Sequence, residues 1–137
     1  MSYSPIIPFL RYRDSTKAVQ WLVDAFGLET FEVNTDGDGN VVHAELRRGD
    51  ATLQVGPPSE DGAMAMRSPL DLPFTSQGVY MNVGSPQDVD EHYARAVAAG
   101  AEIVMELNDT PYGTREYVAK DFEGHIWAFG TYAPKLT

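Results

Sequence analysis

Two side chains that could do chemistry lie two positions apart in a stretch with strand-like alternation. His43 and Glu45 alternate with Val42, Ala44 and Leu46, so both polar side chains point to one face of a β-strand. A histidine and a carboxylate on one surface could act as an acid–base pair that moves a proton next to a carbonyl group. The same two side chains could form a structural pair or two corners of a metal site, but the pattern identifies no third ligand.

Two other metal chemistries are excluded by residue type. Asp36, Asp38 and Asn40 match the opening of a calcium-binding EF-hand loop, but Val41 replaces the glycine at its sixth position and Arg47 the glutamate at its twelfth. Cysteine is absent, so thiolate metal sites, disulfides and thiol nucleophiles are excluded. We therefore interpret residues 36–40 as a glycine-rich hairpin loop.

Two similar helices are predicted from their capping residues and apolar spacing. The first begins at Asp14–Ser15, where either side chain is a good N-cap, and ends at Gly27. The second begins at Ser85–Pro86 and ends at Gly100. On this second helix we expect His92 to lie on the polar, solvent-facing side.

Strand patterns surround each helix in the same order. Strands are predicted at residues 6–12, 29–33, 41–47 and 51–55, and again at 79–83, 101–106, 115–120 and 125–132. The order strand–helix–three strands therefore occurs twice, which predicts an α+β fold of two βαβββ modules. We expect one domain over residues 1–137, with a first module at about 4–56, a connecting loop at 57–77 and a second module at about 78–133.

The overall charge restricts the classes of partner. The 137 residues carry a formal net charge of −10, which repels phosphate backbones, so we expect no nucleic-acid partner. Such a charge would attract a cationic ligand or simply keep the protein in solution. The N-terminal residues form neither a signal peptide nor a membrane span, so we expect a cytoplasmic protein with no membrane partner.

Several segments resemble the vicinal oxygen chelate superfamily, which includes glyoxalase I, bleomycin-resistance proteins and extradiol dioxygenases. They are Asp14–Glu29 (DSTKAVQWLVDAFGLE), Tyr112–Arg115, Asp121–Trp127, and His43–Leu46 followed by Gly49–Asp50. The last pair is similar to the PhnB-like and bleomycin-resistance branches. The resemblance implies that two curved half-sheets form a mixed β-sheet around a central cleft, with helices outside and often a homodimer.

The resemblance also implies where a metal would bind. Enzymes of the superfamily hold a divalent ion on the first and last strands of each module, and these positions fall at Ile7, Gln54, Gly78 and Ala128. Only Gln54 has a lone pair to offer, and one amide oxygen does not hold Zn²⁺, Fe²⁺ or Mn²⁺. We therefore predict that the usual metal site is absent, and we expect no cofactor.

Strand alternation predicts which side chains line the cleft. If the apolar set of each strand packs on its helix, the cleft is lined by a few aromatic and polar side chains. We predict that the ligand-binding residues are Phe9, His43, Glu45, Gln54, Tyr80 and Glu116.

Two functions of different classes are consistent with this lining. The first is a metal-free protein that binds a small, flat or amphipathic molecule, as the bleomycin-resistance branch does by sequestering its antibiotic. The alternative is a lyase, isomerase or dioxygenase that uses a metal site placed elsewhere or acid–base chemistry by His43 and Glu45.

Overall fold

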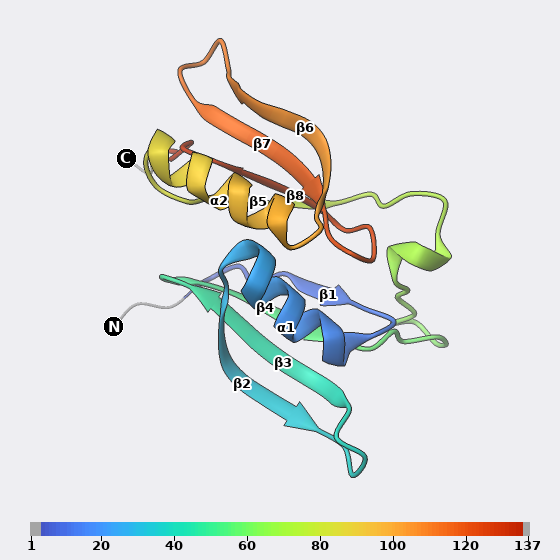
Figure 1. Ribbon diagram of the computed structural model, residues 1–137. Helices are drawn as coiled ribbons and strands as arrows, with labels where there is room; N and C mark the ends of the chain where they lie inside the picture. The colour runs from blue at the N-terminus through green and yellow to red at the C-terminus, as the bar shows by residue number, and fades with distance from the viewer. Residues whose placement is uncertain (1–3, 136–137) are drawn as a thin grey trace. The chain divides into compact units, whose positions relative to one another are not determined.

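The computed structural model describes residues 4–135, and the chain divides into two compact units, Met1–Phe74 and Thr75–Thr137. In the first unit, β1 (Phe9–Arg11) is followed by α1 (Ser15–Phe26), β2 (Glu29–Thr35), β3 (Val41–Arg48) and β4 (Ala51–Gly56) (Figure 1). The four strands form a mixed sheet in the order β1-β4-β3-β2, in which only β1 and β4 are parallel.

The second unit repeats this topology. It contains β5 (Gly78–Asn82), α2 (Pro86–Ala98), β6 (Glu102–Asp109), β7 (Arg115–Lys120) and β8 (Ile126–Gly130). Its sheet has the order β5-β8-β7-β6, with β5 parallel to β8 and the other pairs antiparallel. The predicted α+β class with two βαβββ modules is confirmed, whereas a cleft enclosed by the two sheets stays a prediction.

The helix ends form as their capping residues predict. Asp14 accepts a hydrogen bond from the backbone N–H of Lys17, and Gly27 ends α1 in the left-handed region at φ 70°. Ser85 and Asp88 form a reciprocal capping box at the start of α2. Neither helix is long and apolar enough to cross a membrane, and the same holds for every helix within residues 4–135.

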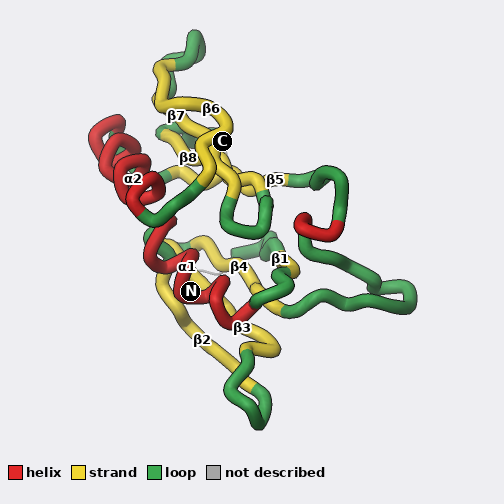
Figure 2. Tube along the Cα trace, turned by 45° about the vertical axis from the view of Figure 1, so that its right-hand side comes forward, coloured by secondary structure: helices red, strands yellow, loops and turns green. Residues whose placement is uncertain are grey.

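The segment between β4 and β5 contains more structure than the predicted loop. A short helix, η1 (Pro69–Asp71), interrupts the loop trace in Figure 2. The Ser68 hydroxyl accepts a hydrogen bond from the Leu70 N–H, and Arg13 forms an ion pair with Asp71. These contacts attach the end of the segment to the start of the first unit.

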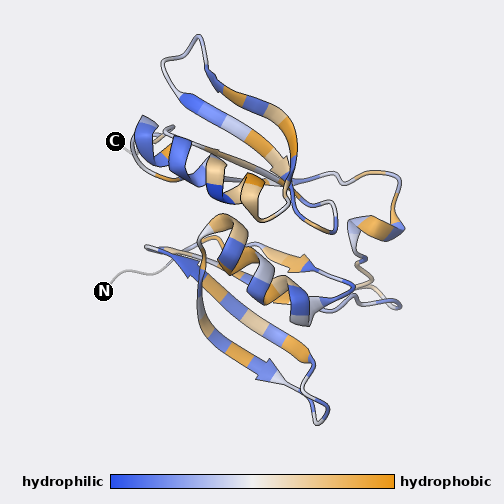
Figure 3. Cartoon of the chain, in the orientation of Figure 1, coloured by the Kyte–Doolittle hydropathy of each residue, from blue (hydrophilic) through white to orange (hydrophobic). Residues whose placement is uncertain are grey.

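In the first unit, α1 covers one face of the sheet with an apolar stripe. Leu22 and Phe26 of α1 are fully buried, as are Ala44 and Leu46 of β3 and Val55 of β4. The alternation of hydrophobic and hydrophilic residues along β3 is visible in Figure 3. Because successive side chains of a strand point to opposite faces, this burial leaves the intervening polar residues on the face away from α1.

A β-bulge changes this alternation at the start of β3. His43 pairs with Asn34, but the next pair is Val41 with Thr35, so Val42 is the extra residue. Val41 is therefore 5% exposed and Val42 is 45% exposed. The expectation that Val42 packs with Ala44 and Leu46 on the helix is wrong at this position.

In the second unit the core beneath α2 is aromatic. Trp127 and Phe129 of β8 and Tyr117 of β7 are fully buried. His92 of α2 is also buried, with its ring centroid 4.3 Å from that of Phe129 and its Nδ1 2.5 Å from the Tyr117 hydroxyl. Burial raises the pKa of Tyr117. The expectation that His92 faces solvent is wrong, because Val89, His92 and Ala96 form the buried stripe of the helix.

A buried carboxylate holds the turn between β7 and β8 in shape. Asp121 accepts hydrogen bonds at 3.0 Å from the backbone N–H groups of Glu123 and His125 and from the indole Nε1–H of Trp127. All three donors would lose their partner if this carboxylate were removed. Together with the backbone hydrogen bonds from Asp121 N–H to His125 and from Gly124 N–H to Asp121, this side chain stabilises the turn.

We predict that Asp121→Ala lowers the free energy of unfolding by about 2–4 kcal/mol, because it leaves buried donors without a partner. Asp36→Ala is the matched control, since Asp36 accepts two backbone N–H bonds in an exposed hairpin, which also lower its pKa. Urea unfolding measures both. Equal losses for the two variants would contradict the assigned role of Asp121.

Candidate functional site

The sheet face away from α1, here the α1-distal face, brings predicted site residues into one row. Phe9 of β1 lies beside Gln54 of β4, Gln54 beside Glu45 of β3, and Glu45 beside Glu32 of β2. Residues paired in register point to the same face of a sheet. His43, two residues before Glu45, shares this face one row further along. Four of the six predicted residues therefore lie on one surface of the first unit.

Arg47 organises the acidic end of this face. Its Nη2 donates to Glu45 Oε1 at 3.2 Å, and its guanidinium carbon lies 3.3 Å from the centroid of the Phe31 ring. Phe31 is the extra residue of a second bulge, between Thr30 and Glu32. Sequence reasoning missed Phe31 because strict alternation does not reveal a bulge, although an aromatic residue in a strand with an arginine on its neighbour was an available signal.

The His43 and Glu45 side chains share the α1-distal face but form no hydrogen bond with each other. Glu45 is bound by Arg47, and the His43 side chain has no hydrogen bond to any residue between 4 and 135. General acid–base catalysis by these two side chains stays a prediction, because it depends on their distance to a substrate. What they provide is a carboxylate in a fixed orientation next to an imidazole that can donate or accept.

On the second unit, the face away from α2 (the α2-distal face) carries the other two predicted residues. The Tyr80 hydroxyl of β5 donates to Glu116 Oε2 of β7 at 2.7 Å and accepts from the backbone N–H of Tyr132 at 3.1 Å. Desolvation and the neighbouring Glu116 raise the pKa of Tyr80 to about 12. The hydroxyl therefore keeps its proton at neutral pH and donates a hydrogen bond to the carboxylate.

Gly130 allows Tyr80 and Glu116 to meet. It lies on β8 between them, paired with Glu116 on one side and with Asn82 on the other. A Cβ atom on Gly130 would lie under 3.0 Å from the Tyr80 hydroxyl oxygen, from Glu116 Cγ and from the Arg115 carbonyl oxygen. Because Gly130 has no side chain, the Tyr80 hydroxyl and the Glu116 side chain can approach each other across β8.

The two distal faces correspond position by position, but their chemistry differs. In the first unit the row Phe9–Gln54–Glu45–Glu32 is aromatic and then polar. In the second unit the corresponding row is Tyr80–Ala128–Val118–Met105, which is aromatic and then apolar. In the next row along each face, His43 of the first unit corresponds to Glu116 of the second unit.

The comparisons with known proteins identify the family. The family model for the Glyoxalase/Bleomycin resistance protein/Dioxygenase superfamily matches residues 6–129. The chain belongs to this superfamily. This confirms the resemblance seen in the sequence at the level of the superfamily.

Three similar proteins illustrate the range of the superfamily. The crystal structure of TioX from Micromonospora sp. ML1 is 34% identical, covers 98% of this chain and 100% of its own, and has a TM-score of 0.73. An uncharacterised protein of Mycobacterium bovis is 32% identical over 90% of this chain and 80% of its own length. The fosfomycin resistance protein FosX of Listeria monocytogenes, crystallised with Mn(II) and sulfate, is 17% identical over 99% of this chain and 94% of its own, with a TM-score of 0.68. At this identity, FosX shares the fold alone.

The donor set does not fit the metal that superfamily enzymes hold on these strands. The register corrects one detail, since Phe9 and not Ile7 lies beside Gln54, and Tyr80 and not Gly78 lies beside Ala128. These four strand positions supply one amide and one tyrosine hydroxyl, and the hydroxyl already donates to Glu116. Within residues 4–135, no three His, Asp or Glu side chains are grouped so that they could hold a metal ion. Neither corrected position adds a ligand that a divalent cation prefers.

We predict that Gly130→Ala lowers the free energy of unfolding by about 1–3 kcal/mol, because the added methyl group forces Tyr80 and Glu116 apart. Gly37→Ala is the control, because a methyl group at Gly37 would have no neighbour within 4 Å and the residue has no positive φ, and we expect a change within about 0.5 kcal/mol. Urea unfolding midpoints measure both variants. A neutral Gly130→Ala variant would contradict the close packing assigned to this position.

Proposed function

We propose that this protein binds a small organic molecule without a metal ion, as the bleomycin-resistance branch of its superfamily does, and that it sequesters an antibiotic. The observation that carries the proposal is the row formed by Phe9, Gln54 and Glu45 on the α1-distal face. This row combines an exposed ring with two polar groups in fixed order. Such a combination suits a ligand with a flat apolar part and hydrogen-bonding groups.

The aromatic end of the row supplies the binding energy. Phe9 is 46% exposed, and a ligand that covered the exposed part of its ring would remove apolar surface from water. At about 25 cal/mol per Å², covering about 80 Å² of that surface yields about 2 kcal/mol. Face-to-edge or stacked contact with a ligand ring would add to this value.

The polar end supplies orientation. The Gln54 amide offers both a donor and an acceptor, and the Glu45 carboxylate offers acceptors only. Arg47 holds Glu45 in place through the hydrogen bond at 3.2 Å, so little side-chain entropy is lost when a ligand binds there. The acidic net charge of −10 further favours a cationic ligand.

The metal-free part of the proposal rests on residue types. Of the superfamily's metal positions, only Gln54 offers an oxygen that is not already engaged. FosX of L. monocytogenes was crystallised with Mn(II), and this chain lacks a comparable set of donors within its described residues. We also propose the homodimer and the cytoplasmic location that the sequence and its resemblance imply.

We predict that metal-free bleomycin binds the protein in buffer containing EDTA, and that Phe9→Ala weakens this binding about tenfold or more through lost apolar contact. Isothermal titration calorimetry measures both. Tyr112→Ala is the matched control, because Tyr112 is 86% exposed at the β6–β7 turn, and we expect it to leave the affinity unchanged. Absence of heat and of thermal stabilisation with wild-type protein, or equal losses in the two variants, would contradict the proposal.

A further inference from the structure

We propose that the Tyr80–Glu116 pair on the α2-distal face is a binding site of the second unit for a cationic group, an amidinium, guanidinium or primary ammonium attached to a flat apolar body. This inference goes beyond the proposed function, because it concerns a surface of the second unit by itself and names the ligand class that this surface would take. It follows from the geometry of three residues, Tyr80, Glu116 and Gly130, and from the side chains next to them.

The Glu116 carboxylate has a fixed position and no cation among the described residues to balance it. One oxygen, Oε2, accepts the Tyr80 hydroxyl, which is held in turn by the Tyr132 N–H. The edge-to-face contact between the Tyr80 and Tyr132 rings, with centroids 6.1 Å apart, further fixes Tyr80. Among residues 4–135, no Lys, Arg or His nitrogen lies within 4.0 Å of Glu116. The neighbouring Arg115 is engaged by Asp90 and Asp109 instead.

The row next to this carboxylate is apolar, whereas its own row contains Asn82, Gly130 and Asn108. Ala128, Val118 and Met105 continue the row from Tyr80 across β8, β7 and β6. A ligand lying on this row would exclude water from one side of Glu116, and a carboxylate in such surroundings attracts a cation more strongly than one in open water. A flat apolar body with a terminal cation matches both features.

The repeat shows that the fold does not need a carboxylate at this position. The corresponding residue of the first unit is His43, which lies two residues before Glu45 on β3 as Glu116 lies two residues before Val118 on β7. The His43 side chain has no hydrogen bond to any described residue, yet its sheet has the same strand order. The acidic pair is therefore a feature of the second unit's surface and not of its architecture.

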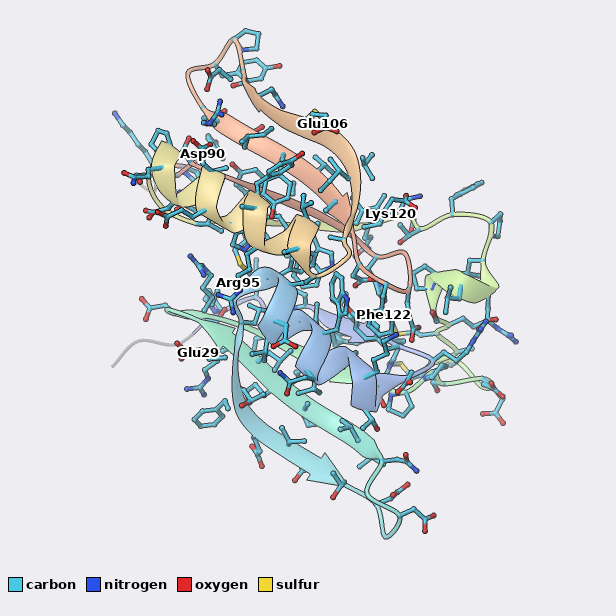
Figure 4. The ribbon with its side chains drawn as sticks, viewed as in Figure 1. Glu29, Asp90, Arg95, Glu106, Lys120 and Phe122 are labelled. Atoms are coloured by element: carbon cyan, nitrogen blue, oxygen red, sulfur yellow. The ribbon has the colours of Figure 1, made fainter. Side chains whose placement is uncertain are left out.

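A second tyrosine–glutamate pair provides a matched control. The Tyr93 hydroxyl of α2 donates to Glu106 Oε2 of β6 at 2.5 Å, and Glu106 and Asp90 are labelled on their elements in Figure 4. This pair joins a helix to a strand, whereas Tyr80 and Glu116 both lie on strands of one sheet. It therefore matches the Tyr80–Glu116 pair in chemistry but not in surroundings.

The test compares a cation with its neutral analogue. Benzamidine, which is cationic at pH 7, and benzamide are titrated separately into ¹⁵N-labelled protein, and NMR shifts give the two dissociation constants. We expect wild-type protein to prefer benzamidine by about fivefold or more, with shifts at residues 80, 116, 118, 128 and 130. Glu116→Gln should reduce the preference to about one while benzamide still binds, and Tyr80→Phe should lower it in part. Glu106→Gln should leave the preference unchanged.

Each other outcome overturns the inference. Equal affinity for the two compounds in wild-type protein, an unchanged preference in Glu116→Gln, or an equal loss in Glu106→Gln would each do so. If neither compound binds while bleomycin does, this inference fails and the proposed function stands. If bleomycin also fails to bind, the proposed function fails as well.

Discussion

The packing of one helix against one face of each four-stranded sheet determines which residues are available for function. Leu22 and Phe26 of α1, and the aromatic residues beneath α2, bury alternate residues of the strands β3, β4, β7 and β8. Because the pleat alternates with a period of two, the remaining residues must share the opposite face. The positions of Phe9, Gln54 and Glu45 in one row, and of Tyr80 with Glu116, follow from this single constraint.

The two distal faces have the same backbone plan but have diverged in chemistry. The α1-distal face holds an arginine-bound carboxylate, an imidazole and exposed rings, whereas the α2-distal face is an apolar row with one carboxylate at its side. A duplicated βαβββ unit can change its surface in this way because the helix-side residues alone maintain the packing.

Local signals in the sequence were sufficient to predict the helices, the repeat and which residues of β4 face the helix. Asp14, Gly27 and Ser85 specify helix ends through contacts within a few residues, so they can be recognised without a structure. The bulges at Phe31 and Val42, the pairing of Phe9 with Gln54 and the burial of His92 depend on partners far along the chain. The space at Gly130 is of the same kind, since it matters only because Tyr80 and Glu116 approach it from two other strands.

The central claim is that ligand binding here needs no metal, because the strand positions used by superfamily enzymes carry Phe9, Gln54, Tyr80 and Ala128. The most direct measurement is the metal content of the purified, untagged protein by plasma mass spectrometry, after incubation with Mn²⁺, Zn²⁺, Fe²⁺ or Ni²⁺ and removal of free ions. We predict that no ion is retained in a stoichiometric amount. Retention of a stoichiometric ion that is lost on substituting Gln54 would contradict the account. It would favour a metal-dependent enzyme as the function of this protein.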